Sequence, residues 1–169
     1  MRSNFILIVC FIGLIILKSY SQTNSIQAFV NVDNVPVSLY SDRLSENVVH
    51  TIMNDSIFEH WYVVEILQES SLRYEVNVMC LQYNTPKIHG WIDKKYCSVY
   101  LGNNAEYLLL RNAPNIDAEY AKVSVDYRIR AVLCHIEENG FIFVEFQKNN
   151  KYYSGWIKDY CPSPIDSCN

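Results

Sequence analysis

Basic residues are scarce and scattered in this sequence, which has 14 Lys and Arg against 18 Asp and Glu. Proteins that bind a nucleic-acid backbone depend on clustered Lys and Arg, so no nucleic-acid partner is expected. No window repeats its apolar residues with the 3.6-residue period of a helix. Helix is therefore expected only in a short turn such as "DKKY".

Residue patterns that carry chemistry are also missing. The histidines show neither H-x-x-x-H nor C-x-x-C spacing, so no metal ion and no cofactor are expected. Cys134 and His135 are adjacent, but neighbouring residues of a strand point to opposite faces and do not form a nucleophile and base pair. Nothing marks out a pair of carboxylates for glycoside hydrolysis. We therefore expect no catalytic residues, and a protein that is not an enzyme.

The first 21 residues are expected to be a signal peptide. Residues 5–17 form an apolar run of thirteen behind Arg2, and Ser19 and Ser21 have the spacing that a signal peptidase recognises. The run is shorter than the roughly 20 residues of a membrane-spanning helix, and no later stretch is apolar enough to span. Loss of Arg2 and Lys18 with this segment changes the net charge from −4 to −6. The mature chain is therefore expected in the periplasm or the medium, without a stable membrane span.

One phrase occurs twice, as "GWIDKKYC" from Gly90 and as "GWIKDYC" from Gly155. A repeat at a fixed period indicates a duplicated structural unit. The 13 tyrosines and the many β-branched residues favour half-buried strands over helices. Asn139-Gly140, inside "EENG", predicts a hairpin between two apolar runs. The predicted fold class is therefore all-β, with the same strand pattern occurring once in each half of the chain.

Strand-like runs follow the same order in both halves of the chain. The first half has "AFVNVDNVPVSLYS", "HWYVVEIL", "YEVNVMCLQ" and "HGWI", and the second has "EYLLL", "DYRIRAVLCHI", "FIFVEF" and "SGWI". Turns are expected at "SDRLSEN", "YNTPK", "RNAPN" and "QKNNKYY". Between the halves only Gly102-Asn103-Asn104 offers a hinge, which is short enough to predict that the two units pack together.

The second half resembles the bacterial SH3-like (SH3b) domain. The matching residues are Leu110-Arg111, Pro114, Val123, Asn139-Gly140, Val144, Gly155-Trp156-Ile157 and Tyr160. It departs at Phe141, where the family often has Trp, and at Cys161, where the family has an apolar Leu. The first half matches only in its order of runs and in its Gly90-Trp91-Ile92 ending. The resemblance implies two tandem SH3-like small β-barrels packed together, with residues 22–101 as a divergent first domain and residues 102–169 as the second.

The resemblance also implies roles for several residues. Each Gly-Trp pair of the repeat is structural, with a large ring closing a small barrel: Gly90, Trp91, Gly155 and Trp156. The best candidates for a ligand surface are aromatic residues at strand ends and turns, as in other aromatic-lined peptide grooves: Trp61, Tyr62, Tyr83, Tyr127, Tyr152 and Tyr153.

Five cysteines remain after the signal peptide, and an exported protein can form disulfides. Cys161 with Cys168 would close a short loop, and Cys80 with Cys97 a longer one. Cys134 competes for the same partners, so the pairing stays open. By the resemblance, Cys97 and Cys161 are equally well explained as small buried residues in place of a core Leu.

The leading functional hypothesis is a non-catalytic exported binding module. Its partner would be peptidoglycan, a peptide ligand, or another envelope or secreted protein. An alternative of a different class is a periplasmic immunity or inhibitor protein that blocks one secreted enzyme, since small size, acidic charge and a signal peptide suit it equally. A neighbouring toxin gene would favour the alternative. A hydrolase of unrecognised type is the third hypothesis, and replacement of Cys134 would test it.

Overall fold

The computed structural model describes residues 25–31, 35–53, 62–81, 86–102, 106–125 and 128–162, and the expected signal peptide lies outside them. The described chain is all-β, as predicted, and its one helical segment is the 3₁₀ turn η1 (Lys94–Tyr96) in the predicted "DKKY". The strands are β1 (Gln27–Val30), β2 (Val37–Tyr40), β3 (Val48–Ile52), β4 (Tyr62–Glu69), β5 (Arg73–Cys80), β6 (Ile88–Asp93), β7 (Cys97–Leu101), β8 (Tyr107–Arg111), β9 (Tyr120–Ser124), β10 (Ile129–Ile136), β11 (Ile142–Lys148) and β12 (Lys151–Ile157).

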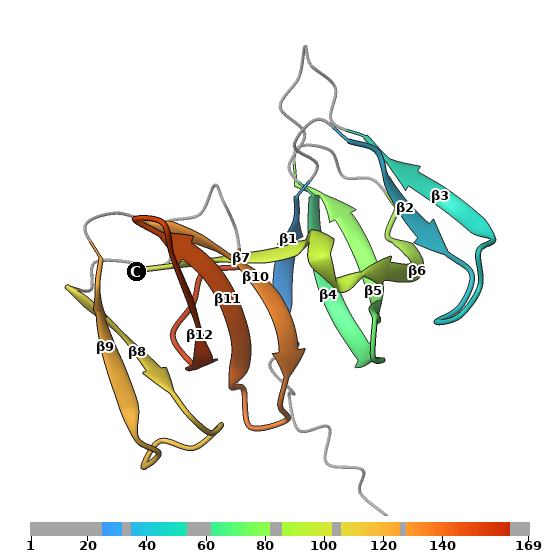
Figure 1. The fold of residues 1–169 in the computed structure, drawn as a ribbon. Helices are drawn as coiled ribbons and strands as arrows, with labels where there is room; N and C mark the ends of the chain where they lie inside the picture. Colours follow the sequence, from blue (N-terminus) through green and yellow to red (C-terminus); the bar gives the residue numbers. More distant parts are fainter. Residues whose placement is uncertain are drawn as a thin grey trace, which may run out of the picture.

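The strands form one antiparallel sheet of 12, in the order β3-β2-β6-β5-β4-β1-β7-β10-β11-β12-β8-β9. We call β2 to β6 with η1 the first half and β8 to β12 the second half. Both have the same internal order, a hairpin whose first strand pairs with the last strand of a three-stranded meander. The duplication seen in the sequence is therefore repeated in the strand order, and the two halves lie side by side with β1 and β7 between them (Figure 1).

The expected pair of separate barrels is not confirmed. β7 pairs with β1 on one side and with β10 on the other, so backbone hydrogen bonds run from one half into the next. The sheet is therefore continuous through β7. Among the described strands β3 and β9 each pair on one side only, so the sheet is not closed into a barrel. The expected hinge begins just after β7, at Gly102, and Asn103 and Asn104 lie outside the described residues.

The repeated glycines occupy corresponding positions in the two halves. A Cβ on Gly90 of β6 would lie 3.1 Å from the Leu39 Cβ of β2, and one on Gly155 of β12 would lie 2.9 Å from the Leu110 Cβ of β8. A Cβ at Gly155 would therefore require β8 to shift, whereas one at Gly90 would require its neighbours on β2 to give way by a few tenths of an ångström.

Alternating side chains from both halves build the core. Leu39, Val76, Leu133 and Ile142 are among the residues with no exposed surface. The halves also share a buried polar contact, in which the Tyr74 hydroxyl of β5 donates to the Leu133 carbonyl of β10 over 3.2 Å. Since an unpaired buried hydroxyl is costly, this bond helps to fix the two halves relative to one another.

The second-half turns follow the sequence predictions. The hairpin between β10 and β11 has Gly140 at a φ of 84°. Asn149 and Asn150, inside the predicted turn "QKNNKYY", have φ values of 50° and 61° and link Lys148 of β11 to its partner Lys151 of β12. Two consecutive residues with positive φ define the hairpin turn whose twist matches that of the flanking strands.

Candidate functional site

The aromatic residues predicted as a ligand surface do not come together where the structure describes them. Tyr62 is half-buried in β4 and its hydroxyl donates to the Met53 carbonyl, while burial raises its pKa. Tyr152 is 85% exposed on β12, and Tyr153 is half-buried and stacks on Phe146 at 5.3 Å. The other three candidates lie outside the described residues: Trp61, Tyr83 and Tyr127.

A different set of rings is aligned across the outer face of the second half. Strand pairing places five residues directly opposite one another on β9, β8, β12, β11 and β10, and we call them the aromatic row: Tyr120, Arg111, Trp156, Phe143 and His135. All five are exposed or half-buried, whereas their neighbours such as Leu110 and Val144 point into the core. Five strands spaced about 4.8 Å apart make the row about 19 Å long.

Ring contacts hold the centre of the row together. The Trp156 indole lies 5.4 Å from the Phe143 ring at 69° and 5.4 Å from the His135 ring at 66°. At the β9 end, the Arg111 guanidinium lies 5.4 Å from the centre of the Tyr120 ring. Edge-to-face and cation–π contacts of this kind are favourable at these separations. The row therefore has two groups of side chains in mutual contact, Trp156 with Phe143 and His135, and Arg111 with Tyr120.

The β10 end of the row meets the first half at a carboxylate. The Glu69 carboxylate of β4 is bonded to His135 Nδ1 and accepts the Ile136 N–H over 3.0 Å. It also pairs with the Lys94 ammonium of η1, which donates to the Cys134 carbonyl over 3.1 Å. Glu69 and Lys94 are only 15% and 16% exposed. This ionic junction fixes the histidine at the end of the row.

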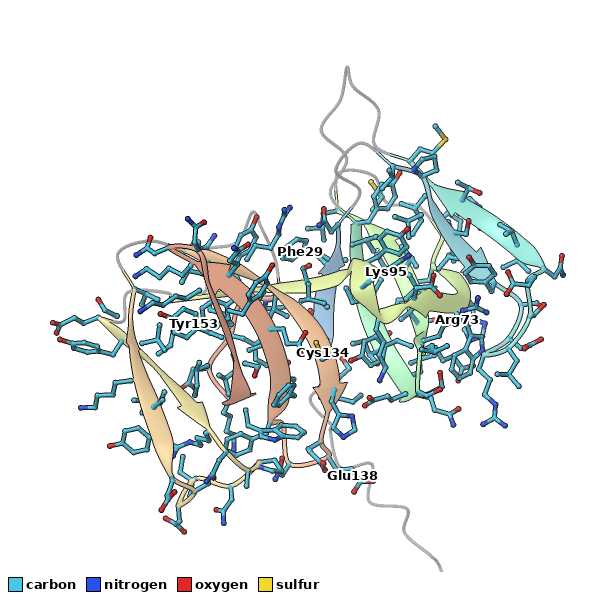
Figure 2. All side chains as sticks on the ribbon, viewed as in Figure 1. Phe29, Arg73, Lys95, Cys134, Glu138 and Tyr153 are labelled. Carbon is cyan, nitrogen blue, oxygen red and sulfur yellow. The ribbon has the colours of Figure 1, made fainter. Side chains whose placement is uncertain are left out.

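Corresponding positions of the first half do not form such a surface. The same register there aligns Tyr40, Trp91, Glu75 and Gln68. Trp91 is 8% exposed and buried. The Arg73 guanidinium covers the Tyr40 ring at 3.6 Å from its centre, and it is bonded to Asp93 and to the carbonyls of the β2–β3 hairpin (Figure 2). At these aligned positions of the described chain, exposed aromatic rings are therefore found in the second half and not in the first.

A β-bulge gives His135 its place in the row. On β10, Leu133 pairs with Val144 of β11, but the next pair is His135 with Phe143, so Cys134 is the extra residue. A bulge of one residue changes which face the following side chains take. The expectation that Cys134 and His135 simply alternate on a regular strand is therefore wrong at this point.

The surroundings of Cys134 and Cys97 suit packing better than nucleophilic attack. Cys134 of β10 is a half-buried free thiol, and it lies on the side of the strand that faces the first half (Figure 2). Burial, and then the nearby Glu145 carboxylate, raise its pKa from 9.0 to about 11. Cys97 is fully buried, and burial raises its pKa further. Both thiols therefore stay protonated at neutral pH, which disfavours the thiolate that a cysteine nucleophile needs.

Cys80 and Cys97 are free thiols, so the disulfide considered between them is wrong. Cys80 ends β5 and Cys97 begins β7, and two strands, β4 and β1, lie between them in the sheet. Three strand spacings amount to about 14 Å, against a limit of about 7 Å between the Cα atoms of a disulfide. Cys161 is fully buried and is not one of the free thiols, and Cys168 lies outside the described residues, so their pairing stays a prediction.

The raised pKa of Cys134 predicts slow alkylation. At pH 8 a thiol of pKa about 11 has about 100-fold less thiolate than one of pKa 9.0. We expect iodoacetamide to modify Cys134 about 100-fold more slowly than a cysteine in an unstructured peptide, and the rate to rise as the pH approaches 11. Mass spectrometry of digests from a Cys80→Ser chain measures this rate. Modification at the rate of the peptide would contradict the buried environment.

Comparisons with known proteins identify no relative whose site could be compared with the aromatic row. No protein-family model, no curated protein and no solved structure matches the chain. Within the described residues, no helix is long and apolar enough to cross a membrane. In the same part of the chain, no three His, Cys, Asp or Glu side chains are grouped so as to hold a metal ion.

Proposed function

We propose that this chain is an exported, non-catalytic binding module made of two tandem SH3-like units, and that its aromatic row holds an extended peptide of the cell envelope, such as a peptidoglycan stem. The order of elements in each half, a hairpin and then a meander that ends in Gly-Trp-Ile, supports the SH3-like assignment. Export rests on the apolar N-terminal run of the sequence.

The aromatic row is the observation that carries the binding proposal. Outer faces of sheets usually carry polar side chains, and a concentration of half-exposed rings is typical of a contact surface. Trp, Tyr and Arg are also the residues that contribute most to binding at protein interfaces. All three types lie in register here, together with Phe143 and His135.

Replacement of Trp156 tests the site. The mature chain from Gln22 is incubated with purified sacculi, and its retention is compared with that of bovine albumin. We expect Trp156→Ala to lower retention about tenfold, because the central ring of the row is lost. Tyr152→Ala is the matched control, since Tyr152 is on the same strand, is 85% exposed and pairs with Gln147 outside the row.

The outcomes separate the parts of the proposal. Retention of the wild-type chain no better than that of albumin would count against binding to the wall. Equal losses in Trp156→Ala and Tyr152→Ala would count against the row as the site. Thermal melts followed by circular dichroism verify that both variants are folded, and Trp156→Phe keeps a ring at the centre of the row as a milder change.

A further inference from the structure

The positive charges beside the row have no carboxylate partner in the described chain. Arg111 donates to the Ala118 carbonyl over 3.2 Å and lies over Tyr120. The Lys122 ammonium lies 5.9 Å from the centre of the Tyr107 ring. Neither takes part in the ion pairs that the described residues form. Other cations of the described residues, among them Lys95 and Lys158, also take part in none of these ion pairs, so Arg111 and Lys122 are distinguished by their place on the face that carries the row.

Three cations of the first half are paired with carboxylates, while Arg43 and Lys95 take part in none of these ion pairs. Arg73 pairs with Asp93 over 2.9 Å, and Lys87 pairs with Glu65 over 3.0 Å. Lys94 pairs with Glu69 at the junction between the halves. The two halves therefore differ at corresponding positions. In the first half Tyr40 is covered by Arg73, which is paired with Asp93. In the second half the exposed rings lie beside Arg111, which has no carboxylate partner among the described residues.

Arg111 lies next to the apolar part of the row, and Lys122 lies two residues along β9 from Tyr120 on the same face. Arg111 is directly opposite Trp156 on the neighbouring strand, which is a step of about 4.8 Å. Lys122 is opposite Leu109, a half-exposed apolar residue on the same face as Arg111. A ligand that satisfies both features needs a negative group and an apolar group within about one residue length of each other.

We infer that the aromatic row binds an extended acidic peptide, with a Glu or Asp side chain against Arg111 and Lys122 and the adjacent apolar side chain against Trp156 and Phe143. This inference rests on the proposed function and adds the charge of the ligand to it. Complementary charge gives such a surface its selectivity more than its affinity. Arg and Lys also recognise carboxylates by charge-assisted hydrogen bonds.

The ring geometry favours a peptide over a glycan strand. Trp156 meets Phe143 at 69° and His135 at 66°, so the centre of the row presents edges and faces at steep angles to each other. Separate side chains of an extended peptide fit between rings set at such angles. A flat stack of rings, which a sugar ring would cover, is not what these angles produce.

Three synthetic peptides test the charge of the ligand. Each has eight residues and blocked ends, and alternates Phe with Glu, with Gln or with Lys. Binding to the mature chain is measured by fluorescence anisotropy. We expect the Glu peptide to bind about fivefold more tightly than the Gln peptide, because one or two partly exposed ion pairs contribute modestly. The Lys peptide is expected to bind most weakly, and added salt should reduce the advantage of the Glu peptide.

Variants locate the charge effect. Arg111→Gln and Lys122→Gln should each lower affinity for the Glu peptide by a larger factor than affinity for the Gln peptide, so that the preference for Glu is reduced. Arg111→Lys should keep most of the preference, because it keeps the charge. Lys151→Gln is the control, since Lys151 is an exposed lysine in the β11–β12 hairpin, away from the row. Melting curves confirm that each variant is folded.

The results distinguish this inference from the proposed function. If all three peptides bind equally and Trp156→Ala abolishes that binding, the acidic ligand is overturned and the proposed binding module is retained. Absence of peptide binding together with retention on sacculi would also overturn the acidic peptide, and would favour a glycan ligand. Absence of binding in both assays would overturn both proposals.

Discussion

Replacement of Gly155 by Ala is expected to lower the free energy of unfolding by about 3 kcal/mol, because overpacking against backbone is relieved only by moving a strand. The new Cβ would lie 2.9 Å from the Leu110 Cβ and 3.2 Å from the Arg111 carbonyl oxygen of β8. For a domain of this size, such a loss lowers the melting temperature by about 6–12 °C. Thermal unfolding followed by circular dichroism measures the change.

Two other glycines provide the comparison for Gly155. Gly140 has a φ of 84°, and a Cβ there would meet only the Lys158 Cε at 3.9 Å, so Gly140→Ala should cost about 1–2 kcal/mol from backbone strain alone. Gly90→Ala places its Cβ 3.1 Å from Leu39 and should fall between the two. If the Gly155→Ala chain has the same melting temperature as the wild type, β8 does not lie against β12 as described.

Replacement of Glu69 by Gln is expected to cost about 2–3 kcal/mol of stability, because it leaves the largely buried Lys94 ammonium without a carboxylate. The new amide side chain would still offer an oxygen to the Ile136 N–H, so the loss reports mainly on charge. Lys94→Met in the same chain should recover part of the loss, since it removes the unpaired cation. Urea denaturation of the single and double variants measures each contribution.

Glu65→Gln is the matched control for Glu69→Gln. Glu65 is on the same strand, and it pairs with Lys87, whose side chain is 53% exposed. Its pKa is lowered mainly by the hydrogen bond from Lys87 and then by the bond from Asn77. Exposed pairs of this kind contribute about 0–1 kcal/mol. Equal losses for Glu65→Gln and Glu69→Gln would show that the junction between the halves contributes no more than a surface ion pair.

Local sequence patterns are sufficient to predict most of the strands. Alternating runs such as "FIFVEF" and turn residues such as Asn139-Gly140 act over a few residues, and β11 and its hairpin follow them. The short turn at "DKKY" forms η1 for the same reason. β7 has no separate prediction, because its five residues follow η1 directly and their pattern does not indicate which strands will pair with them.

The candidate site is much harder to predict. From the sequence around each residue, Trp156 is interpreted as a structural ring and Arg111 only as the last residue of a strand. Their alignment depends on the pairing of β8 with β12, which places residues 45 positions apart in the chain opposite one another. His135 joins the row only because the bulge at Cys134 changes its face. Neither long-range register nor a bulge of one residue is fixed by local alternation.

The sequence by itself determined the all-β class, the duplicated order of strands and the two Gly-Trp-Ile strands, since propensity and alternation act between near neighbours. Tertiary structure alone decided that the halves join through β7 into one sheet, that Cys80 and Cys97 stay apart, and that five side chains align as the aromatic row. These features depend on which distant strands pair and in which register, and that choice is made by packing of the whole core.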